Sequence, residues 1–217
     1  MPEQDRLVNR APTTEEQLRA ASIGELRPLT EPIRLVEYDP NWPAQFEREA
    51  AAIGSALGKR ALQIEHVGST SVPGLAAKPI IDVLLVVADS ADEPAYVPAM
   101  EAADYVLCIR EPDWYQHRLF SGPRVAVNVH VFATGSGGPE IERMLRFRDR
   151  LRDHPADRAL YERLKRQLAA RDWKYTRITP TPRRPWSRRS SRGRATREGE
   201  PRAQPALRNY PRPRSRW

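Results

Sequence analysis

Residues 65–87 read EHVGSTSVPGLAAKPIIDVLLVV, a turn-forming segment that leads into an almost purely apolar run. Four small or hydroxyl-bearing residues follow a predicted strand directly: Gly68, Ser69, Thr70 and Ser71. Such a turn can present backbone N–H groups and hydroxyls to a phosphate, particularly where a helix begins. The same residue types also form purely structural turns and helix caps, so both interpretations stay open.

Asp82 is the one acid in the apolar run 80–87, which is typical of a strand buried on both faces. A buried carboxylate is unfavourable unless it is paired, protonated or metal-bound. In the later segment VAVNVHVFA (125–133), valines alternate with Asn128 and His130. If the two strands are neighbours, the alternation of strand side chains gathers Asp82, Asn128 and His130 on one face beside the turn. The pattern predicts either a functional site or a buried Asp–His pair that stabilises the sheet.

The N-terminal part of the chain predicts two helices and a strand. Thr13 and Glu16 can form a capping box for a short helix that ends near Ile23. Residues 33–38 are typical of a short strand. Asn41 can cap a longer helix, whose apolar stripe comprises Phe46, Ala50, Ile53 and Leu57.

The remainder of the body continues this mixed α and β pattern, without an internal repeat. We expect strands at 61–66, 80–87 and 105–109, a hairpin of 117–122 and 125–133, and helices near 97–103, over 141–151 and from Pro155.

The excess of basic over acidic residues lies entirely in the C-terminal part of the chain. Residues 177–217 hold thirteen Arg and two Glu, a balance of +11, against +8 for the whole chain, so residues 1–176 carry −3. The tail is rich in Pro and Ser and poor in aliphatic residues, which predicts disorder. It could be a nucleic-acid- or lipid-binding arm, an inert extension, or the product of a frameshift in a GC-rich gene. We favour the frameshift.

Several classes of protein are excluded by composition. No run of eighteen apolar residues is present, and residues 1–17 lack the apolar core of a secretory signal. Cys108 is the single cysteine, so neither disulfides nor a Cys-rich zinc site can form. We expect a cytoplasmic protein without a membrane partner.

Long segments of the chain resemble the GrpB family. The resemblance rests on IRLVEYDPNWPAQFEREAAAIGSALG, on the block GSTSVPGL-x-AKP-x-ID within 65–87, on NVHVF and on YERLKRQLAARDWKYT, and covers residues 33–176. It implies an α+β, nucleotidyltransferase-like fold with a mixed β-sheet flanked by helices. The expected organisation is an N-terminal extension (1–30), a GrpB-like domain (31–176) and a disordered tail (177–217). Because family members usually continue with helical sequence after this point, the abrupt change at Arg177 supports the frameshift interpretation.

The resemblance also implies a catalytic pattern that this chain matches only in part. The superfamily carries a Gly-Ser turn, a strand with two acids spaced D-x-D, and a third acid on a later strand, which together hold two Mg²⁺ ions. Gly68-Ser69 and Asp82 match the first two elements, but Leu84 stands where the second acid belongs. No carboxylate occurs in 125–133. One carboxylate does not hold two Mg²⁺ ions, whereas Asp82 and His130, joined by His66 or Glu65, would suit a single transition metal better.

Two more residues could meet an anion near the turn. Lys78 lies just before the Asp82 strand and could equally be a surface lysine that caps the turn. Arg118 lies in the predicted hairpin, where we favour a solvated strand-face residue over an anion clamp. The candidate phosphate-binding set is therefore Gly68, Ser69, Thr70, Ser71, Lys78 and Arg118. Asp82 and His130 are the candidate catalytic residues, and Asp82, His130 and His66 are the candidate ligands of a divalent metal.

These features predict a nucleotide-binding, nucleotidyltransferase-like protein whose ligand is a nucleotide or another phosphorylated small molecule. The alternative is a non-catalytic module that assists an enzyme of CoA biosynthesis, because related domains are fused to some actinobacterial dephospho-CoA kinases. The chain lacks the G-x-x-x-x-G-K-[ST] loop, so it does not carry P-loop kinase activity itself. A third hypothesis is nucleic-acid binding through the tail, which would weaken steeply with salt.

Overall fold

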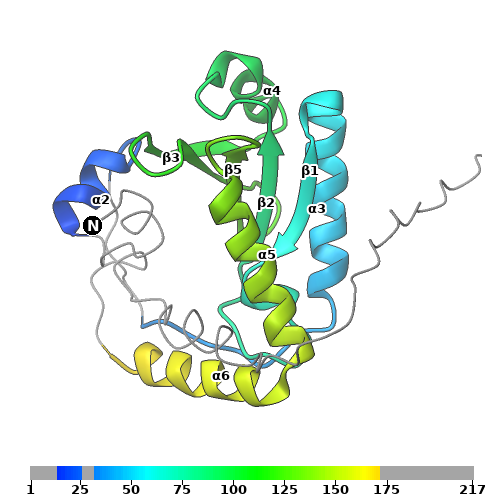
Figure 1. Cartoon of the computed structure of the whole chain (residues 1–217), viewed down its shortest axis with the longest axis vertical. Helices are drawn as coiled ribbons and strands as arrows, with labels where there is room; N and C mark the ends of the chain where they lie inside the picture. The colour runs from blue at the N-terminus through cyan, green and yellow to red at the C-terminus, as the bar shows by residue number, and fades with distance from the viewer. Residues whose placement is uncertain (1–13, 26–31, 172–217) are drawn as a thin grey trace, which may run out of the picture. The chain divides into compact units, whose positions relative to one another are not determined.

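Five strands form one mixed sheet in the computed structural model of the protein, which describes residues 14–25 and 32–171 (Figure 1). The strands are β1 (Gln63–Val67), β2 (Ile81–Val87), β3 (Val106–Glu111), β4 (His117–Ser121) and β5 (Val127–Ala133). Their order across the sheet is β1-β2-β5-β4-β3. The central pair β2 and β5 is parallel and all other pairs are antiparallel, which confirms the expected α+β fold with a mixed sheet.

One face of the sheet is covered by α3 (Trp42–Leu57), the helix expected after Asn41. Phe46, Ile53 and Leu57 lie in the core and pack with alternate residues of the central strands, including Val83 and Val129. Asn41 is the N-cap residue, although its side chain makes no capping hydrogen bond. The short helix α4 (Val97–Glu101) and the 3-10 turns η1 (Gly58–Arg60) and η3 (Glu93–Ala95) complete this layer.

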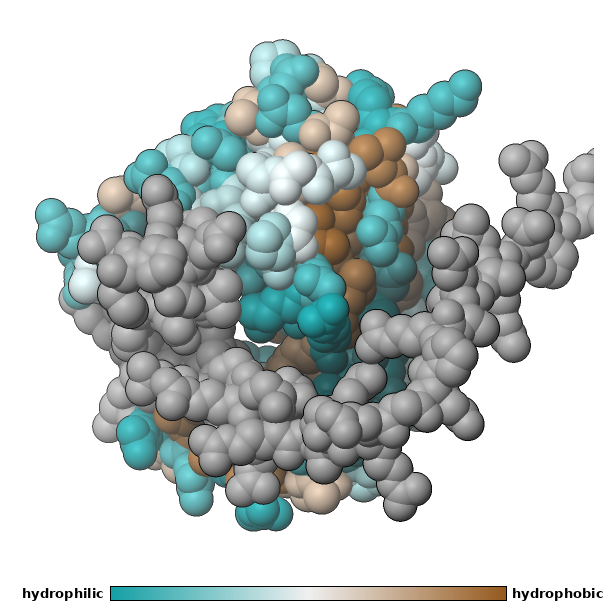
Figure 2. Space-filling view, viewed as in Figure 1, coloured by the Kyte–Doolittle hydropathy of each residue, from teal (hydrophilic) through white to brown (hydrophobic). Residues whose placement is uncertain are grey.

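The opposite face is covered by α5 (Gly138–Asp153), which Figure 1 shows lying across the sheet. Ile141, Met144 and Leu145 of this helix pack against Leu84 and Phe132. The helix α6 (Pro155–Ala169) follows and runs below the sheet in the view of Figure 1. Figure 2 shows that the described residues on this side are mainly hydrophilic, with a strip of hydrophobic residues among them.

The segment between β1 and β2 forms a small core of its own with the two C-terminal helices. Val72 and Leu75 are buried against Leu151 of α5 and Tyr161 of α6. The turn predicted to hold a phosphate is therefore fixed in place by apolar contacts of the residues that follow it.

Three predicted elements differ in the structure. Residues 33–38 do not form a strand but make a single bridge, Val36 to Ala77. The pairing does not continue on either side of this bridge. Pro79 has no N–H group to donate, and the N–H group of Leu75 donates to the carbonyl of Val72 instead. In addition, β1 and β3 are each shifted toward the C-terminus by one or two residues from the predicted ranges.

The N-terminal capping box also lies one residue later than expected. Thr14, not Thr13, is the N-cap of α2 (Glu15–Ala21), and its partner is Gln17, not Glu16. Thr13 and the predicted tail 177–217 lie outside the described residues. Within residues 14–25 and 32–171, no helix combines the length and the apolar character needed to cross a membrane.

Candidate functional site

The turn after β1 has a backbone that requires glycine at its first position. Gly68 adopts φ 68° and ψ −168°, a region that side chains other than glycine rarely enter. The 3-10 turn η2 (Ser69–Ser71) follows at once. Because the first N–H groups of such a turn have no acceptor within it, they are available to a ligand on the outside.

The hydroxyls of the turn do not all have the same role. Thr70 Oγ1 donates to the carbonyl of Ile80 at 3.1 Å, and Ser71 Oγ donates to the carbonyl of Gly68 at 2.7 Å. Both side chains are buried; Thr70 ties the turn to the residue before β2, and Ser71 closes the turn on itself. Ser69 is half-buried, so among the three its hydroxyl is the best placed to contact a ligand.

Asp82 lies directly against this turn. A Cβ atom added to Gly68 would stand 2.2 Å from Asp82 Oδ2, which shows how closely the carboxylate approaches the Gly68 backbone. Asn128 Nδ2 donates to Asp82 Oδ1 at 3.1 Å, and His130 Nε2 lies 3.7 Å from the same oxygen. The structure thus brings together the three residues that strand alternation placed on one face. The side chains of Asp82 and His130 are 27% and 22% exposed, so a ligand can reach both.

Two lysines lie within the electrostatic field of Asp82. Burial lowers the pKa of Lys78, and the negative charge of Asp82 opposes this shift. Burial also lowers the pKa of Lys165 to about 8, again opposed by Asp82. Lys165 Nζ donates to the carbonyl of Ala76 at 2.8 Å, in the segment between the turn and β2. Lys165 comes from α6, and nothing in the local sequence indicated it.

His130 is also the middle of a chain of polar contacts that the sequence did not reveal. His117 Nε2 lies 3.1 Å from His130 Nδ1, and His117 Nδ1 lies 2.8 Å from Glu111 Oε2. His117 is fully buried and Glu111 is 6% exposed. Glu111, His117, His130 and Asp82 come from β3, β4, β5 and β2, so the chain crosses four strands of the sheet.

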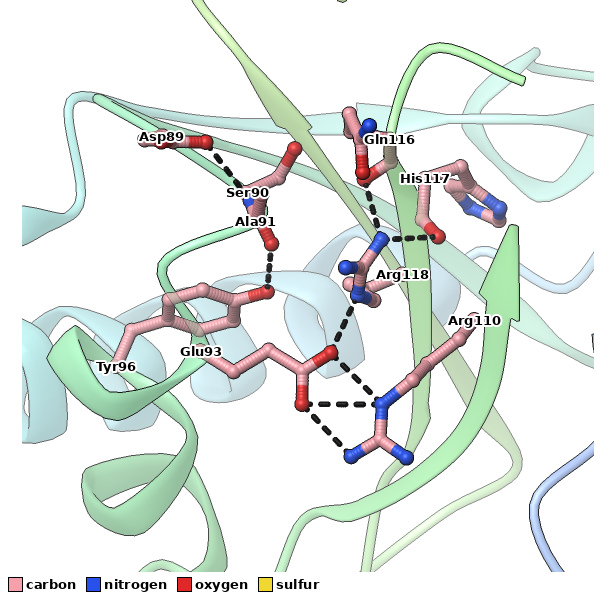
Figure 3. A network of polar contacts seen from close by, with 9 residues as sticks. All are labelled: Asp89, Ser90, Ala91, Glu93, Tyr96, Arg110, Gln116, His117 and Arg118. Carbon is pink, nitrogen blue, oxygen red and sulfur yellow. Dashed lines mark hydrogen bonds and ion pairs between the residues drawn. The ribbon is translucent and has the colours of Figure 1, made fainter. Parts of the chain in front are cut away.

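Arg118 does not join the turn, contrary to the prediction for a phosphate-binding residue. It pairs in register with Val131, whose side chain lies in the core on the α3 side, so Arg118 faces away from His130. Its Nε donates to Glu93 Oε1 at 2.6 Å, and Arg110 binds the same carboxylate (Figure 3). The guanidinium is buried in a structural network with Glu93.

His66 lies on the α3 face as well, and so does not stand with Asp82 and His130. Its ring stacks on Phe46 with centroids 4.7 Å apart, and its Nε2 lies 3.1 Å from Thr70 Oγ1. Burial, reinforced by the positive charge of Arg152, lowers the pKa of His66 to about 4. His66 is therefore neutral at physiological pH, and it contacts Thr70 of the turn from the α3 side of the sheet.

The donor set does not fit the two-Mg²⁺ centre of the nucleotidyltransferase signature. Leu84, at the position of the second acid, is fully buried in the apolar cluster under α5. Among residues 14–25 and 32–171, no group of three or more His, Cys, Asp and Glu side chains is arranged to hold a metal ion. Asp82 and His130 alone offer two ligands, and His66 does not supply a third.

A cavity of about 500 Å³ lies along the edge strand β1, next to the turn. Its lining includes Phe46 of α3, His66 of β1, Ser71 of the turn and Arg152 of α5. Arg152 donates from Nε and Nη2 to the carbonyl of Ser71 at 3.0 and 2.8 Å. The volume is in the range of small-molecule pockets, but Ser69, Lys78 and Asp82 are not among the lining residues, so the cavity lies on the His66 side of the turn.

Comparison with known proteins agrees with this architecture. The family model described as GrpB protein matches residues 32–179. A UPF0157 protein of Halalkalibacterium halodurans is 56% identical over 174 residues, which cover 80% of this chain and 88% of that protein. A UPF0157 protein of Streptomyces coelicolor is 45% identical over 141 residues, 65% of this chain and 73% of that protein.

A crystal structure and a named enzyme are also similar to this chain. The crystal structure of the conserved protein GrpB from Enterococcus faecalis matches with a TM-score of 0.57 and 39% identity, over 63% of this chain and 82% of that one. A dephospho-CoA kinase of Mycolicibacterium paratuberculosis is 32% identical over 166 residues. That match covers 64% of this chain and only 40% of the kinase, so most of the enzyme has no counterpart here.

Proposed function

The chain belongs to the GrpB family, and on that premise we propose that it binds a nucleotide or another phosphorylated small molecule at the turn that follows β1. The observation that carries the proposal is the contact of Asp82 with the Gly68–Ser71 turn at a partly exposed place, with Lys78 close enough for its charge to interact with Asp82. All three lie within residues 68–82, in the turn, the segment that follows it and the start of β2.

The Ser69–Ser71 turn suits a phosphate for electrostatic reasons. The N–H groups at the start of η2 and the hydroxyl of Ser69 are donors, and Lys78 and Lys165 bring positive charge. Asp82 would repel a phosphate in direct contact, so the phosphate lies toward the lysines and the turn. Asp82 is then free to accept a hydrogen bond from a polar group of the ligand.

Nucleotidyl transfer is a less well supported form of the same proposal. The signature needs several acids to hold two Mg²⁺ ions, and this site offers Asp82 alone, beside the buried Leu84. We therefore propose binding as the function and derive no transfer step from the site.

A second candidate is an accessory role in CoA biosynthesis. It is favoured by the similarity to part of a dephospho-CoA kinase, in which a GrpB-like region accompanies a larger remainder. On this hypothesis the chain binds a CoA precursor, or the kinase itself, without catalysing a reaction. A CoA precursor would occupy the same turn, so one set of measurements tests the first candidate and the precursor-binding form of the second.

The test is thermal unfolding of the full-length protein with nucleoside triphosphates, dephospho-CoA and CoA precursors, each with EDTA, Mg²⁺, Mn²⁺ or Zn²⁺. A ligand at one hundred times its Kd adds about 2.7 kcal/mol, which raises the midpoint by roughly 5–10 °C in a protein of this size. Lys78→Gln should reduce this rise. Lys59→Gln, the same change at an exposed lysine of η1, should leave it intact.

Two results would contradict the proposal. One is the absence of a midpoint rise with every phosphorylated ligand. The other is an equal rise in Lys78→Gln and Lys59→Gln, which would place the ligand elsewhere. Asp82→Asn distinguishes metal-dependent from metal-independent binding. It should abolish a ligand-induced rise in the midpoint that requires a divalent ion, and preserve a rise that also occurs in EDTA.

A further inference from the structure

We propose that His130 accepts a hydrogen bond through Nε2 from a hydroxyl of the bound ligand, and that His117 and Glu111 are positioning residues that make this possible. The inference rests on the proposed function and narrows it, since the ligand must then carry a hydroxyl as well as a phosphate. The contacts between these side chains carry the argument.

The tautomer of His117 follows from Glu111. A carboxylate only accepts hydrogen bonds, so the 2.8 Å contact between Glu111 Oε2 and His117 Nδ1 places a proton on that nitrogen. We infer that this is the single N–H of His117, so that its Nε2 carries a lone pair.

The tautomer of His130 follows from His117 in the same way. The 3.1 Å contact between His117 Nε2 and His130 Nδ1 needs one proton, which must then belong to His130. Its single N–H is therefore at Nδ1, and Nε2 is left as an acceptor. The buried carboxylate at one end of the chain thus determines which atom His130 presents at the other end.

The orientation of both rings is fixed by packing. His117 stacks on Phe132 with centroids 4.7 Å apart, and Trp114 meets it edge-on at 5.2 Å. The rings of His117 and His130 are inclined by 22°, with centroids 5.3 Å apart, which suits a hydrogen bond between their edges. A group held by neighbours in this way does not have to be ordered when the ligand binds, which favours affinity.

At the open end of the chain, two acceptors face each other. His130 Nε2 and Asp82 Oδ1 are 3.7 Å apart, too far for a direct hydrogen bond. Both side chains are partly exposed beside the phosphate-binding turn. A ligand hydroxyl placed here can donate to one acceptor while its phosphate lies at Ser69.

The experiment uses the full-length protein labelled with ¹⁵N in histidine, with the four histidines assigned by single His→Gln variants. Long-range proton–nitrogen correlation spectra at neutral pH report which ring nitrogen carries the proton. We expect the proton of His130 on Nδ1. A proton on Nε2, or a cationic ring, would overturn the inference without any variant having to fold.

Variants separate positioning from simple packing. His117→Phe keeps the volume and removes the acceptor, so His130 should move to the Nε2–H form that neutral histidine prefers in water. Glu111→Gln keeps a carbonyl acceptor for His117 and should preserve the Nδ1–H form of His130. Glu111→Leu should not preserve it. The same tautomer of His130 in all three variants would mean that His117 and Glu111 only pack.

The ligand step is tested by titrating the labelled protein with ATP and with 2′,3′-dideoxy-ATP. ATP should shift both the Ser69 amide and His130 Nε2, whereas the dideoxy analogue should shift only the amide and bind about fivefold more weakly. Equal shifts of Nε2 with both nucleotides, or none with either, would refute the inference and leave phosphate binding intact. No shift at the Ser69 amide with ATP or with any other phosphorylated ligand of the unfolding screen would remove the proposed function, and this inference with it.

Discussion

Replacing Gly68 with alanine tests whether the turn and Asp82 form one rigid unit. The new Cβ would stand 2.2 Å from Asp82 Oδ2 and 2.8 Å from Asp82 Cβ, so the carboxylate has to move. The backbone region of Gly68 costs about 1–3 kcal/mol for a residue with a side chain. Displacing Asp82 from Asn128 costs about 1.5–3 kcal/mol more, the usual value for a hydrogen bond to a charged group. We expect Gly68→Ala to lower the free energy of unfolding by about 3–5 kcal/mol.

Gly74→Ala is the matched control. Gly74 also has a positive φ, 73°, but nothing lies within 4 Å of an added Cβ. It should show the backbone strain alone, about 1–2 kcal/mol. Urea unfolding of both variants, with m values compared, measures the difference. In an Asp82→Gly background the cost of Gly68→Ala should fall to that of Gly74→Ala, since the clashing atoms are gone. Equal costs for the two glycines in the wild-type background would refute the close approach of Asp82 to the turn.

Three further predictions concern residues that the sequence placed at the site. The lowered pKa of His66, about 4 when folded and 6.5 when unfolded, means that the unfolded chain binds the extra proton between these values. Stability should therefore rise by up to about 3 kcal/mol from pH 4 to 6.5, and His66→Gln should flatten the pH profile of urea unfolding. Leu84→Asp, which would restore the second acid of the signature, should lower the unfolding free energy by more than about 4 kcal/mol because the site is fully buried; a stable variant in urea would contradict the packing under α5. Arg118→Met should lower the free energy of unfolding by about 1–3 kcal/mol, because it removes the ion pair with Glu93. It should leave the ligand-induced rise in the unfolding midpoint unchanged. A smaller rise would show that Arg118 contributes to ligand binding.

The central part of the site could be predicted because it depends on alternation along two strands. Asp82, Asn128 and His130 share a face once the two strands are neighbours, and the parallel pairing of β2 with β5 aligns Asp82 with Asn128. The apolar stripe of α3 was equally readable, since a helix repeats its buried face every three to four residues. Both patterns are local in sequence.

The errors arose where the register between strands decides the outcome. Alternation within β4 says that Arg118 and Phe120 share a face, but only the pairing of Arg118 with Val131 says which face that is. The same holds for His66, which pairs with Val83 and so turns toward α3. A shift of one residue in either strand would have put these side chains where they were expected.

The contributions of Lys165 and of Glu111 could not be seen from the sequence for a different reason. Lys165 reaches the segment before β2 from a helix 89 residues further along the chain. Glu111 and His117 are six residues apart, and their contact depends on the hairpin of β3 and β4, whose pairing contains an irregularity between Leu107 and Ile109. Such contacts depend on the tertiary fold, and no periodic pattern in the sequence predicts them.

The most direct test of phosphate binding at the turn is a calorimetric titration with the nucleotide that raises the unfolding midpoint most. Ser69→Asp places a negative charge where the phosphate is proposed to lie, on a half-buried side chain. Ser55→Asp makes the same change at an exposed position of α3. We predict that Ser69→Asp weakens binding at least about tenfold, equivalent to about 1.4 kcal/mol, while Ser55→Asp binds as the wild type does. Wild-type affinity in Ser69→Asp would contradict the proposed site.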